Sequence, residues 1–426
     1  MANTLLTDQH ITQEALMILE NNLTFTKHVD RQLDAEFKNA KRGATISVRK
    51  PPRYVLRDGQ NIAIQDTVQT QVPFTLSHQF GVDVEFFSSD LALSISDFGE
   101  EILKPQIAVI SNGIDWAGMQ LASKVANAIG TPGTTPGYGL TTNLGQNTLA
   151  QYTQANAILD KTATPRDSER NAVINEDAQS VLVSNLSGLF QDSTDIGRQY
   201  REGTMGRTIG NKFSMDQNAS IITIGAFSGT ATVNGAGQGM LTPPGQALGT
   251  AGYTPFTLNV NGFTPNATVA GPGDRFTLPG MYMTNPQNHQ SGNKLQTFVV
   301  LNATPVVASA TGTAALMIEP PIIASGAYQT VSKQPANGDA LSWLGVPGTQ
   351  AVQNLIFHKT AFTFASVNLP LPMGMHMAAR KSDKKLGISL RFVAGYQIAT
   401  DQFIGRFDVL CGWLCQRPEC AVVLYG

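Results

Sequence analysis

The sequence predicts an α+β fold with an inserted all-β domain, and two stretches carry that prediction. From Ser96 to Gly130, apolar residues recur at steps of three or four, which places them on one side of a long α-helix. From Gln217 to Ser332, only four side chains are charged, and Gly or Pro interrupts the chain every few positions. Such breaks disfavour helices and favour short strands. A mixed domain interrupted by a small β-barrel follows from these two patterns.

The composition is that of a globular protein with few charges. Of 426 residues, 42% are hydrophobic and 14% are charged, and the net charge is −2. These values argue against disorder and against binding of nucleic acid or acidic membranes through overall charge. A surface with few charges suits a protein that is covered by copies of itself. No apolar run reaches the ~20 residues of a membrane span, and the N-terminal stretch lacks the pattern of a signal peptide.

Residues 1–42 are expected to form an N-terminal helical arm. The spacing of apolar residues predicts a helix over 7–21 and a second helical piece over 31–40. The arm has little apolar core of its own. Two interpretations follow: the arm packs on its own domain, or it grips a neighbour or a partner protein.

Residues 43–80 are expected to form an extended two-stranded ribbon. Six basic residues and no acidic one lie between Lys41 and Arg57, and Asp58–Gly59 is a typical hairpin turn. The ribbon has few large apolar residues, so it has to lie on another part of the structure. Its basic run is expected to meet acidic side chains of a neighbouring subunit. Contact with nucleic acid is the alternative, but no aromatic residues are interleaved with the basic ones.

The pattern 81–87 predicts a strand that leads into the long helix, which is expected over 97–129. Ser96 is a suitable N-cap, and Gly130 ends the periodic pattern. Pro105 lacks a backbone donor, so the helix is expected to start or to kink there.

Two glycines lie inside the predicted long helix. Gly113 and Gly118 each lower helix stability by about 1 kcal/mol relative to alanine. One interpretation is that a neighbouring backbone approaches closely at these positions. The other is that the helix bends there when an assembly changes shape.

Helices are also expected over 147–161 and 176–189, with a short strand at 171–174, which completes a first part of the main domain over 81–222. The inserted β-domain is expected over 223–331. Its predicted strands lie at 221–224, 256–260, 274–278, 295–301 and 315–318.

Residues 332–426 are expected to return to the main domain. Asn354–Pro372 is predicted to open as a helix, whereas 387–398 and 403–414 read as strands. Asp401 lies just before the second of these strands, and Asp408 lies within it. They are expected to form salt bridges with Arg406 or Arg391 rather than an acid–base pair.

Motifs of catalysis are absent from the sequence. It contains no G-x-S-x-G elbow, no phosphate-binding P-loop and no HExxH pair. The glycines of NGAGQGM are not followed by a helical pattern, so they read as a plain loop. Three cysteines near the C-terminus (411, 415 and 420) have no nearby histidine to complete a zinc site, and reduced thiols are expected. The sequence predicts a protein that is not an enzyme and that needs no metal or cofactor.

The order of these segments resembles that of tailed-phage major capsid proteins: an N-arm, an extended loop, a spine helix in a peripheral domain, and an axial domain. FSSDLALSISDFGEEILKPQIAVISNGIDWAGMQLASKVANAI (87–129) resembles the spine region. GDRFTLPGMYMTNPQ (273–287) resembles the insertion domain of coat proteins from short-tailed phages, and NLIFHKTAFTFASVNLPLP (354–372) resembles the segment that follows it. The resemblance covers essentially the whole chain and carries no active site.

The resemblance implies a structural shell protein of the virion, assembled in the bacterial cytoplasm. Its partners would be further copies of itself in hexamers and pentamers, a scaffolding protein, a portal protein and the packaged double-stranded DNA, with no membrane. A virion decoration or tail protein that binds a surface ligand is the alternative, but it would need neither the long helix nor the ribbon. The candidate site residues are Arg49, Lys50, Arg53 and Arg57 for subunit contact, Asp8, Glu14 and Glu20 for scaffold contact, and Gly113 and Gly118 for bending of the spine helix.

Overall fold

The computed structural model describes most of the chain, in seven blocks separated by gaps. The described residues are 8–33, 45–87 without 63, 66 and 68, 104–132, 149–186, 207–240, 256–400 without 375–376 and 384–386, and 402–425. They divide into two compact units. We call Met1–Ile46, Phe74–Met119 and Phe362–Leu414 the helix–sheet unit, and Ser47–Pro73, Gln120–Ala361 and Cys415–Gly426 the β-rich unit.

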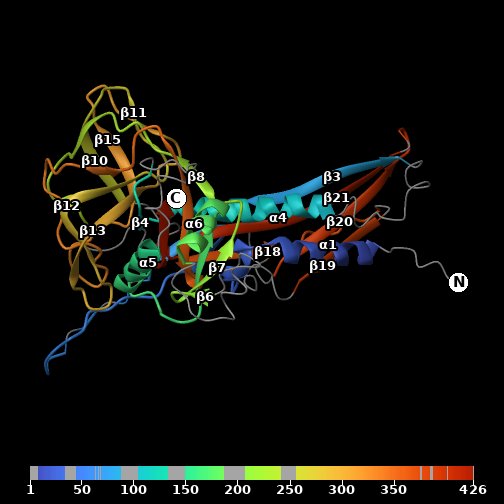
Figure 1. Cartoon of the computed structure of the whole chain (residues 1–426), viewed down its shortest axis with the longest axis horizontal. Coiled ribbons are helices and arrows are strands. Elements are labelled where there is room, and N and C mark those ends of the chain that lie inside the picture. The colour runs from blue at the N-terminus through green and yellow to red at the C-terminus, as the bar shows by residue number, and fades with distance from the viewer. Residues whose placement is uncertain are drawn as a thin grey trace. The chain divides into compact units, whose positions relative to one another are not determined.

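The helix–sheet unit places two helices along a five-stranded sheet (Figure 1). The helices are α1 (Asp8–Asn22) and α4 (Lys104–Met119), with a short 3-10 turn η1 (Phe25–His28) between them in the sequence. The sheet consists of β18 (Phe362–Val367), β21 (Gln402–Cys415), β20 (Ser389–Gln397), β19 (Met377–Ser382) and β3 (His78–Phe87). β3 pairs with β21 along its whole length. The strands expected at 81–87, 387–398 and 403–414 are therefore confirmed.

Asp408 in β21 is fully buried and carries two salt bridges. Its carboxylate lies 2.5 Å from Nη2 of Arg391 and 2.7 Å from Nε of Arg406. This is the pairing that the sequence predicts for Asp408. Asp401 lies outside the described residues.

The β-rich unit contains a seven-stranded sheet with two helices packed on it, α5 (Leu149–Lys161) and α6 (Glu176–Leu186). Its strands are β4 (Ala128–Ile129), β22 (Ala421–Tyr425), β17 (Gln350–His358), β5 (Arg170–Ile174), β7 (Asn211–Met215) and β6 (Arg207–Thr208) in spatial order, with β8 (Ser220–Thr223) pairing with β17. Tyr152 and Leu159 of α5 pack with Ile356 and Leu424 in the core beneath the helices. Both helices follow the predicted spacing.

The prediction that Asn354–Pro372 opens as a helix is wrong. The segment continues β17, passes a short 3-10 turn η5 (Lys359–Ala361) and then forms β18. Every residue from Gln353 to His358 is buried, because β17 lies between two neighbouring strands and is covered on both faces. A strand covered on both faces is apolar without alternation, and this pattern is easily confused with a short buried helix.

The spine helix is shorter at its C-terminal end than predicted. α4 ends at Met119, a 3-10 turn η4 (Gln120–Lys124) follows, and residues 128–129 form β4. Val125 donates its N–H to the carbonyl of Ala122, three residues back, so the α-helical bonding pattern is not continued. Residues 121–129 keep the apolar spacing because they are buried by other elements. The predicted start at 97 lies outside the described residues.

A curled six-stranded sheet forms most of the predicted insert (Figure 1). Its strands, in spatial order, are β16 (Ser342–Leu344), β12 (Arg275–Thr284), β13 (Ser291–Val300), β15 (Ala314–Glu319), β10 (Phe256–Phe263) and β9 (Gly229–Val233), and a separate pair is formed by β11 (Thr268–Ala270) and β14 (Val306–Val307). The sheet extends to residue 344, beyond the predicted boundary at 331, because β16 pairs with β12. Backbone bonds also join Leu341 to Ala231 and Val233 to Asp339.

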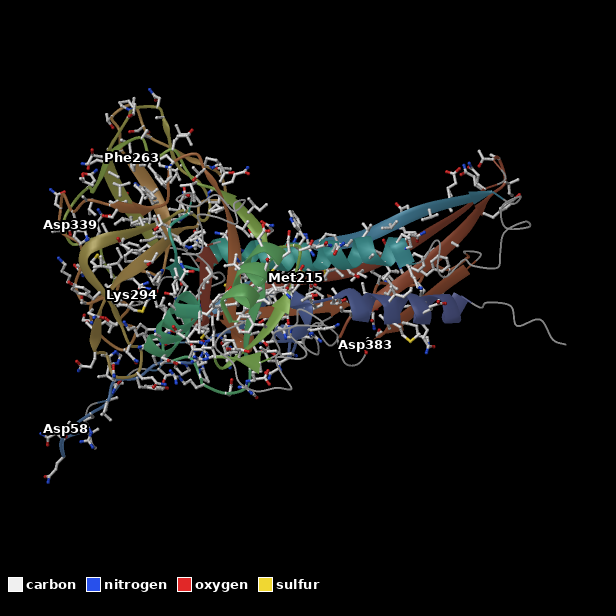
Figure 2. The ribbon with its side chains drawn as sticks, viewed as in Figure 1. Asp58, Met215, Phe263, Lys294, Asp339 and Asp383 are labelled. Carbon is white, nitrogen blue, oxygen red and sulfur yellow. The ribbon has the colours of Figure 1, made fainter. Side chains whose placement is uncertain are left out.

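The ribbon is paired only near its base, where β1 (Thr45–Arg49) lies beside β2 (Gln71–Thr75). The described residues between Lys50 and Thr70 form no further strand. Figure 2 labels Asp58 in this segment. Leu56, Ile62 and Ile64 expose 85% or more of their surface there. Among the described residues, no helix is long and apolar enough to cross a membrane.

Candidate functional site

A group of charged residues in the β-rich unit holds the base of the ribbon. We call Lys50, Arg53, Glu319, Arg417 and Glu419 the loop-base cluster. Nη2 of Arg53 lies 3.3 Å from Oε1 of Glu419, and Nε of Arg417 lies 3.5 Å from the same oxygen. The backbone N–H of Arg53 also donates to the Tyr328 hydroxyl at 3.3 Å. The ribbon is thereby bonded to residues that are far from it in the sequence.

The two carboxyl groups of the loop-base cluster titrate differently. Burial raises the pKa of Glu319 to about 7, although the charges of Lys50 and Arg53 partly oppose this. Glu419 is also desolvated, but the combined charges of Lys50, Arg53 and Arg417 outweigh this effect and lower its pKa. At neutral pH, Glu419 is therefore ionised and paired, whereas Glu319 is close to its midpoint of protonation.

The cluster borders a cavity of about 280 Å³ whose walls are mostly apolar. Six of its lining residues are prolines: Pro51, Pro52, Pro286, Pro320, Pro321 and Pro418. The described lining contains no Ser–His or Cys–His pair that could serve nucleophilic catalysis. Within the described residues, no group of three or more His, Cys, Asp or Glu side chains could hold a metal ion. The loop-base cluster therefore suits a structural role, in which it holds the base of the ribbon against the rest of the β-rich unit.

The four basic residues predicted for subunit contact are not brought together. Arg49 and Arg57 are exposed, and Arg57 donates to the backbone oxygen of Asn61 within the ribbon. Lys50 and Arg53 are half-buried in the loop-base cluster of their own chain. Only the first pair therefore presents its charge outward.

A buried aspartate fixes the segment after α1 to the spine helix. The carboxylate of Asp115 in α4 accepts bonds from the backbone N–H groups of Thr24, Phe25 and Thr26 at 2.6, 3.2 and 3.0 Å, and from the Thr26 hydroxyl. These are the free donors at the N-terminus of η1, where a negative charge is stabilising. The arm over this part of the chain thus packs on its own unit, as in the first interpretation.

The acidic residues predicted for scaffold contact all lie in α1. Glu14 is half-buried, and the side chains of Asp8 and Glu20 are outside the described part of the structure. One face of α1 is buried through Ala15 and Leu19, and the helix packs against α4, β19 and β20.

The two spine glycines have different surroundings. A Cβ atom added at Gly118 would lie 2.7 Å from ring atoms of Phe25 and Trp413, which is too close for van der Waals contact. A Cβ atom at Gly113 would lie 3.5 Å from Phe80, an ordinary contact distance. The packing interpretation therefore has direct support at Gly118 and none at Gly113.

Sequence reasoning missed a buried charged pair, Asp274 and Arg275, at the start of β12. Arg275 donates to the backbone oxygens of Ala122, Val125 and Gly273 at 2.8, 2.9 and 3.1 Å, and to the Tyr425 hydroxyl. It thereby satisfies carbonyls at the end of η4. The signal was available, because these are two of only four charges in the stretch 217–332.

Asp274 accepts hydrogen bonds from two connecting segments, one between β8 and β9 and one between β11 and β12. Its carboxylate accepts the N–H of Gly225 at 3.1 Å and that of Gly271 at 2.6 Å. Burial nevertheless raises the pKa of Asp274 to about 6, because desolvation outweighs these bonds.

Comparison with known proteins gives one match over the whole chain. The family model described as "P22 coat protein - gene protein 5" matches residues 1–426. No curated protein sequence matches the chain. Among solved structures, the chain is similar to that titled "Mycobacterium phage Che8" (TM-score 0.48, 11% identity, 94% of this chain and 90% of that chain). It is also similar to the capsid of Cyanophage P-SCSP1u (TM-score 0.42, 11% identity, 94% and 86%) and to the mature capsid of bacteriophage PhiM1 (TM-score 0.43, 8% identity, 90% and 82%).

Proposed function

The chain belongs to the P22 coat protein family over its whole length, and from this premise we propose how its copies build a shell. It is a major capsid protein of a tailed phage, a structural component of the virion and not an enzyme. Our proposal is that hexamers and pentamers of the chain assemble with a scaffolding protein into an icosahedral procapsid in the host cytoplasm. The procapsid then takes up double-stranded DNA through a portal protein and expands.

The full-length family match is the observation that supports this proposal. Negative-stain imaging of the chain expressed with and without its scaffolding protein tests it. Closed shells of uniform size are expected with the scaffold. A small oligomer that never closes under either condition would refute assembly into a shell and favour a decoration or tail protein.

For the ribbon, we infer contact with a neighbouring subunit. The outward side chains support this: Arg49 and Arg57 are exposed, and Leu56, Ile62 and Ile64 are apolar and 85–90% exposed. Apolar groups exposed to this extent on a segment without a core of its own are stabilised when a partner covers them. Arg49→Ala with Arg57→Ala should weaken assembly, more at low salt than at high salt. If these substitutions changed only DNA retention, the partner would be nucleic acid instead.

For the arm, we infer that acidic residues of α1 meet the scaffolding protein. Ala15 and Leu19 are buried within the subunit, whereas Glu14 keeps part of its surface exposed; Asp8 and Glu20 are the other candidates. Reversing all three charges should abolish co-assembly with the scaffold while leaving the monomer folded. Unchanged co-assembly would refute this role.

For the insert, we propose a closed β-barrel that stabilises the monomer. The backbone bonds between residues 338–341 and β9 support closure, because they join the two edges of the curled sheet.

For the spine helix, we propose that Gly113 and Gly118 allow a change of curvature during expansion. Normal expansion of a shell with alanine at both positions would refute that role.

A further inference from the structure

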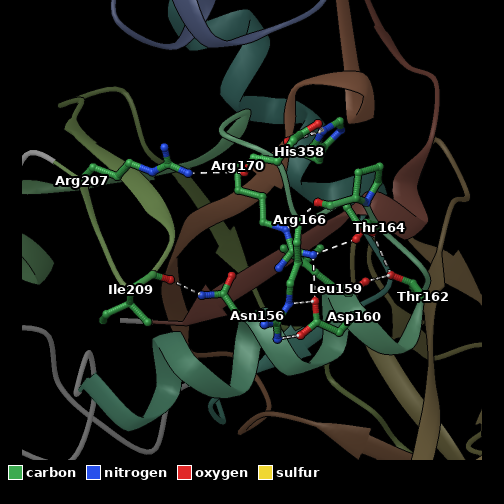
Figure 3. Close-up of polar contacts among 12 residues, drawn as sticks. Asn156, Leu159, Asp160, Thr162, Thr164, Arg166, Arg170, Arg207, Ile209 and His358 are labelled. Carbon is green, nitrogen blue, oxygen red and sulfur yellow. Dashed lines mark hydrogen bonds and ion pairs between the residues drawn. The ribbon is translucent and has the colours of Figure 1, made fainter.

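A second cavity in the β-rich unit is lined by three arginines. It has a volume of about 410 Å³ and lies between α5 and the turn that joins β6 to β7. Arg166, Arg170 and Arg207 line it, with Asp160 and Asp167 as the acidic residues. Figure 3 shows the three arginines and Asp160 with their polar contacts. None of these residues contributes to the loop-base cluster.

Asp160 is fully engaged by two of the arginines. Nε of Arg166 and Nη2 of Arg170 each lie 2.8 Å from Oδ1 of Asp160. Arg170 also donates to the backbone oxygens of Thr164 and Pro165 at 2.8 and 2.9 Å, and its side chain is only 4% exposed. The hydrogen bond from Arg166 is the main reason why the pKa of Asp160 is lowered. Arg170 and Asp160 therefore form a buried ion pair whose charges compensate each other in the wall of the cavity.

The other nearby carboxylates also have partners. Both oxygens of Asp167 lie 3.1 Å from Nε2 of His358, and Glu169 pairs with Lys359 at 3.8 Å. In the described part of the chain, no carboxylate lies within ion-pair distance of Arg207, whose hydrogen bond runs to a backbone oxygen.

Arg207 is exposed and weakly bonded. Among the described residues, its one hydrogen bond runs from Nη2 to the backbone oxygen of Asp167 at 3.4 Å, and it forms no ion pair. In the β6–β7 ladder it stands directly opposite Lys212, which is exposed as well. Like charges opposite each other destabilise an antiparallel pair. An anionic ligand would turn this repulsion into a favourable interaction.

A buried amide adds a polar group to the same cavity. Nδ2 of Asn156 donates to the backbone oxygen of Ile209 at 3.0 Å, which fixes the orientation of the amide. Its Oδ1 is buried and has no hydrogen-bond partner among the residues that the structure describes, and Asn156 is only 9% exposed. This oxygen can accept a bond from a water that bridges to a ligand.

We propose that Arg207 and Lys212, with the outer face of Arg166, bind phosphate groups of the nucleic-acid backbone. Guanidinium groups match phosphate oxygens in a two-bond geometry, which Arg207 can offer. Arg166 is 74% exposed beside the cavity; its Nε and Nη2 donate to Asp160, so its contribution is limited to its outer nitrogens. No aromatic side chain lines the cavity, so contact with backbone phosphates is favoured over base stacking. The inference rests on the proposed function, in which the shell encloses double-stranded DNA.

The test measures binding of the full, unassembled chain to a fluorescein-labelled 20-base-pair duplex by fluorescence anisotropy. Arg207→Gln with Lys212→Gln should weaken binding by about tenfold or more at 50 mM KCl. A plot of log K against log salt concentration has a negative slope, and the variant should make this slope shallower by about 1.8, since each lost phosphate contact contributes about 0.9. Arg207→Lys with Lys212→Arg keeps both charges and should keep the slope. Arg49→Gln with Arg57→Gln, which removes two exposed charges from the ribbon, is the matched control and should leave binding nearly unchanged.

The inference would be overturned by unchanged affinity and slope in the Arg207/Lys212 variant, or by a loss of affinity of the same size in the ribbon variant. Displacement of the labelled duplex by poly-glutamate as readily as by unlabelled duplex would also overturn it. Displacement by millimolar inorganic phosphate at constant ionic strength would assign the site to free phosphate and equally refute a nucleic-acid role. The Arg207/Lys212 variant should still close empty shells with the scaffold. Failure of the wild-type chain to form shells would count against the proposed function alone.

Discussion

Replacing Arg275 with methionine tests whether this buried arginine holds the insert onto the rest of the β-rich unit. The substitution keeps a long apolar side chain but removes all bonds to Ala122, Val125, Gly273 and Tyr425. Three backbone oxygens then lose a donor in a buried site, at about 1–3 kcal/mol each, which gives roughly 3–9 kcal/mol. Burial of the methionine side chain returns about 2 kcal/mol. We expect a net loss of about 1–7 kcal/mol in the free energy of unfolding.

Urea unfolding followed by tryptophan fluorescence measures this loss. Trp343 stands in β16, where its neighbour Leu344 pairs with Arg275, so it reports on the affected region. Trp116→Phe and Trp413→Phe remove the other two tryptophans of the chain. Tyr425→Phe is the matched control, because it removes one partner and leaves every carbonyl bonded; we expect a loss of about 0.5–1.5 kcal/mol. If Arg275→Met were no less stable than Tyr425→Phe, the reasoning about the three carbonyls would be refuted.

The remaining predictions concern the arm, the loop base, the spine helix and the shell. Asp115→Asn should lower the free energy of unfolding of the helix–sheet unit by about 2–3 kcal/mol, because it weakens charge-assisted bonds to three backbone N–H groups. Asp83→Asn, at an exposed position, is the control, and an equal loss of stability in both variants would contradict the argument. The folded-state pKa of Glu319 is raised from 4.5 to about 7, so its contribution to stability is greatest below pH 4.5 and falls as the pH rises to about 7. Glu319→Gln should remove this fall, which is at most about 3 kcal/mol, in urea unfolding measured at several pH values. Parallel curves of stability against pH for both proteins would contradict the argument. Gly118→Ala should destabilise by about 1–3 kcal/mol through contact with Phe25 and Trp413, whereas Gly113→Ala should be neutral or stabilise by up to about 1 kcal/mol; thermal unfolding with the opposite order would contradict the packing argument. Mature shells should release intact monomers on a denaturing gel, because the subunit contacts that we expect are charged and apolar rather than covalent; ladders of linked subunits would contradict this.

Local patterns predicted most elements of the structure, and the errors have a physical origin. Helices α1, α5 and α6 and strand β3 follow their apolar spacing, because one face of each is more buried than the other. β20 and β21 were predicted as strands as well, although consecutive residues such as Phe392–Ala394 and Phe407–Val409 are buried in them. β17 was misassigned because it is buried on both faces and its residues do not alternate. The end of α4 was misplaced because the residues beyond it are buried by contacts with β22 and Arg275, which are distant in the sequence.

The candidate site was predictable only in part. The basic run of the ribbon was visible in the sequence, but the division into exposed Arg49 and Arg57 and engaged Lys50 and Arg53 depends on Glu419 near the other end of the chain. The pairing of Asp408 with Arg391 and Arg406 was predicted because the three residues are close in the sequence. Asp115 was missed because its partners are backbone groups about 90 residues away.

The place of β22 in the seven-stranded sheet has a consequence for how the chain folds as it is synthesised. β22 is made after the other six strands of this sheet, yet it lies between β4 and β17. The end of β22 lies 296 residues beyond the end of β4 (425 − 129), which corresponds to roughly 15–60 s at usual synthesis rates. During that time the nascent chain exposes an incomplete sheet, and pairing over so long a separation is slow. The sheet is therefore completed only after residues 421–425 have left the ribosome, and the core beneath it forms no earlier.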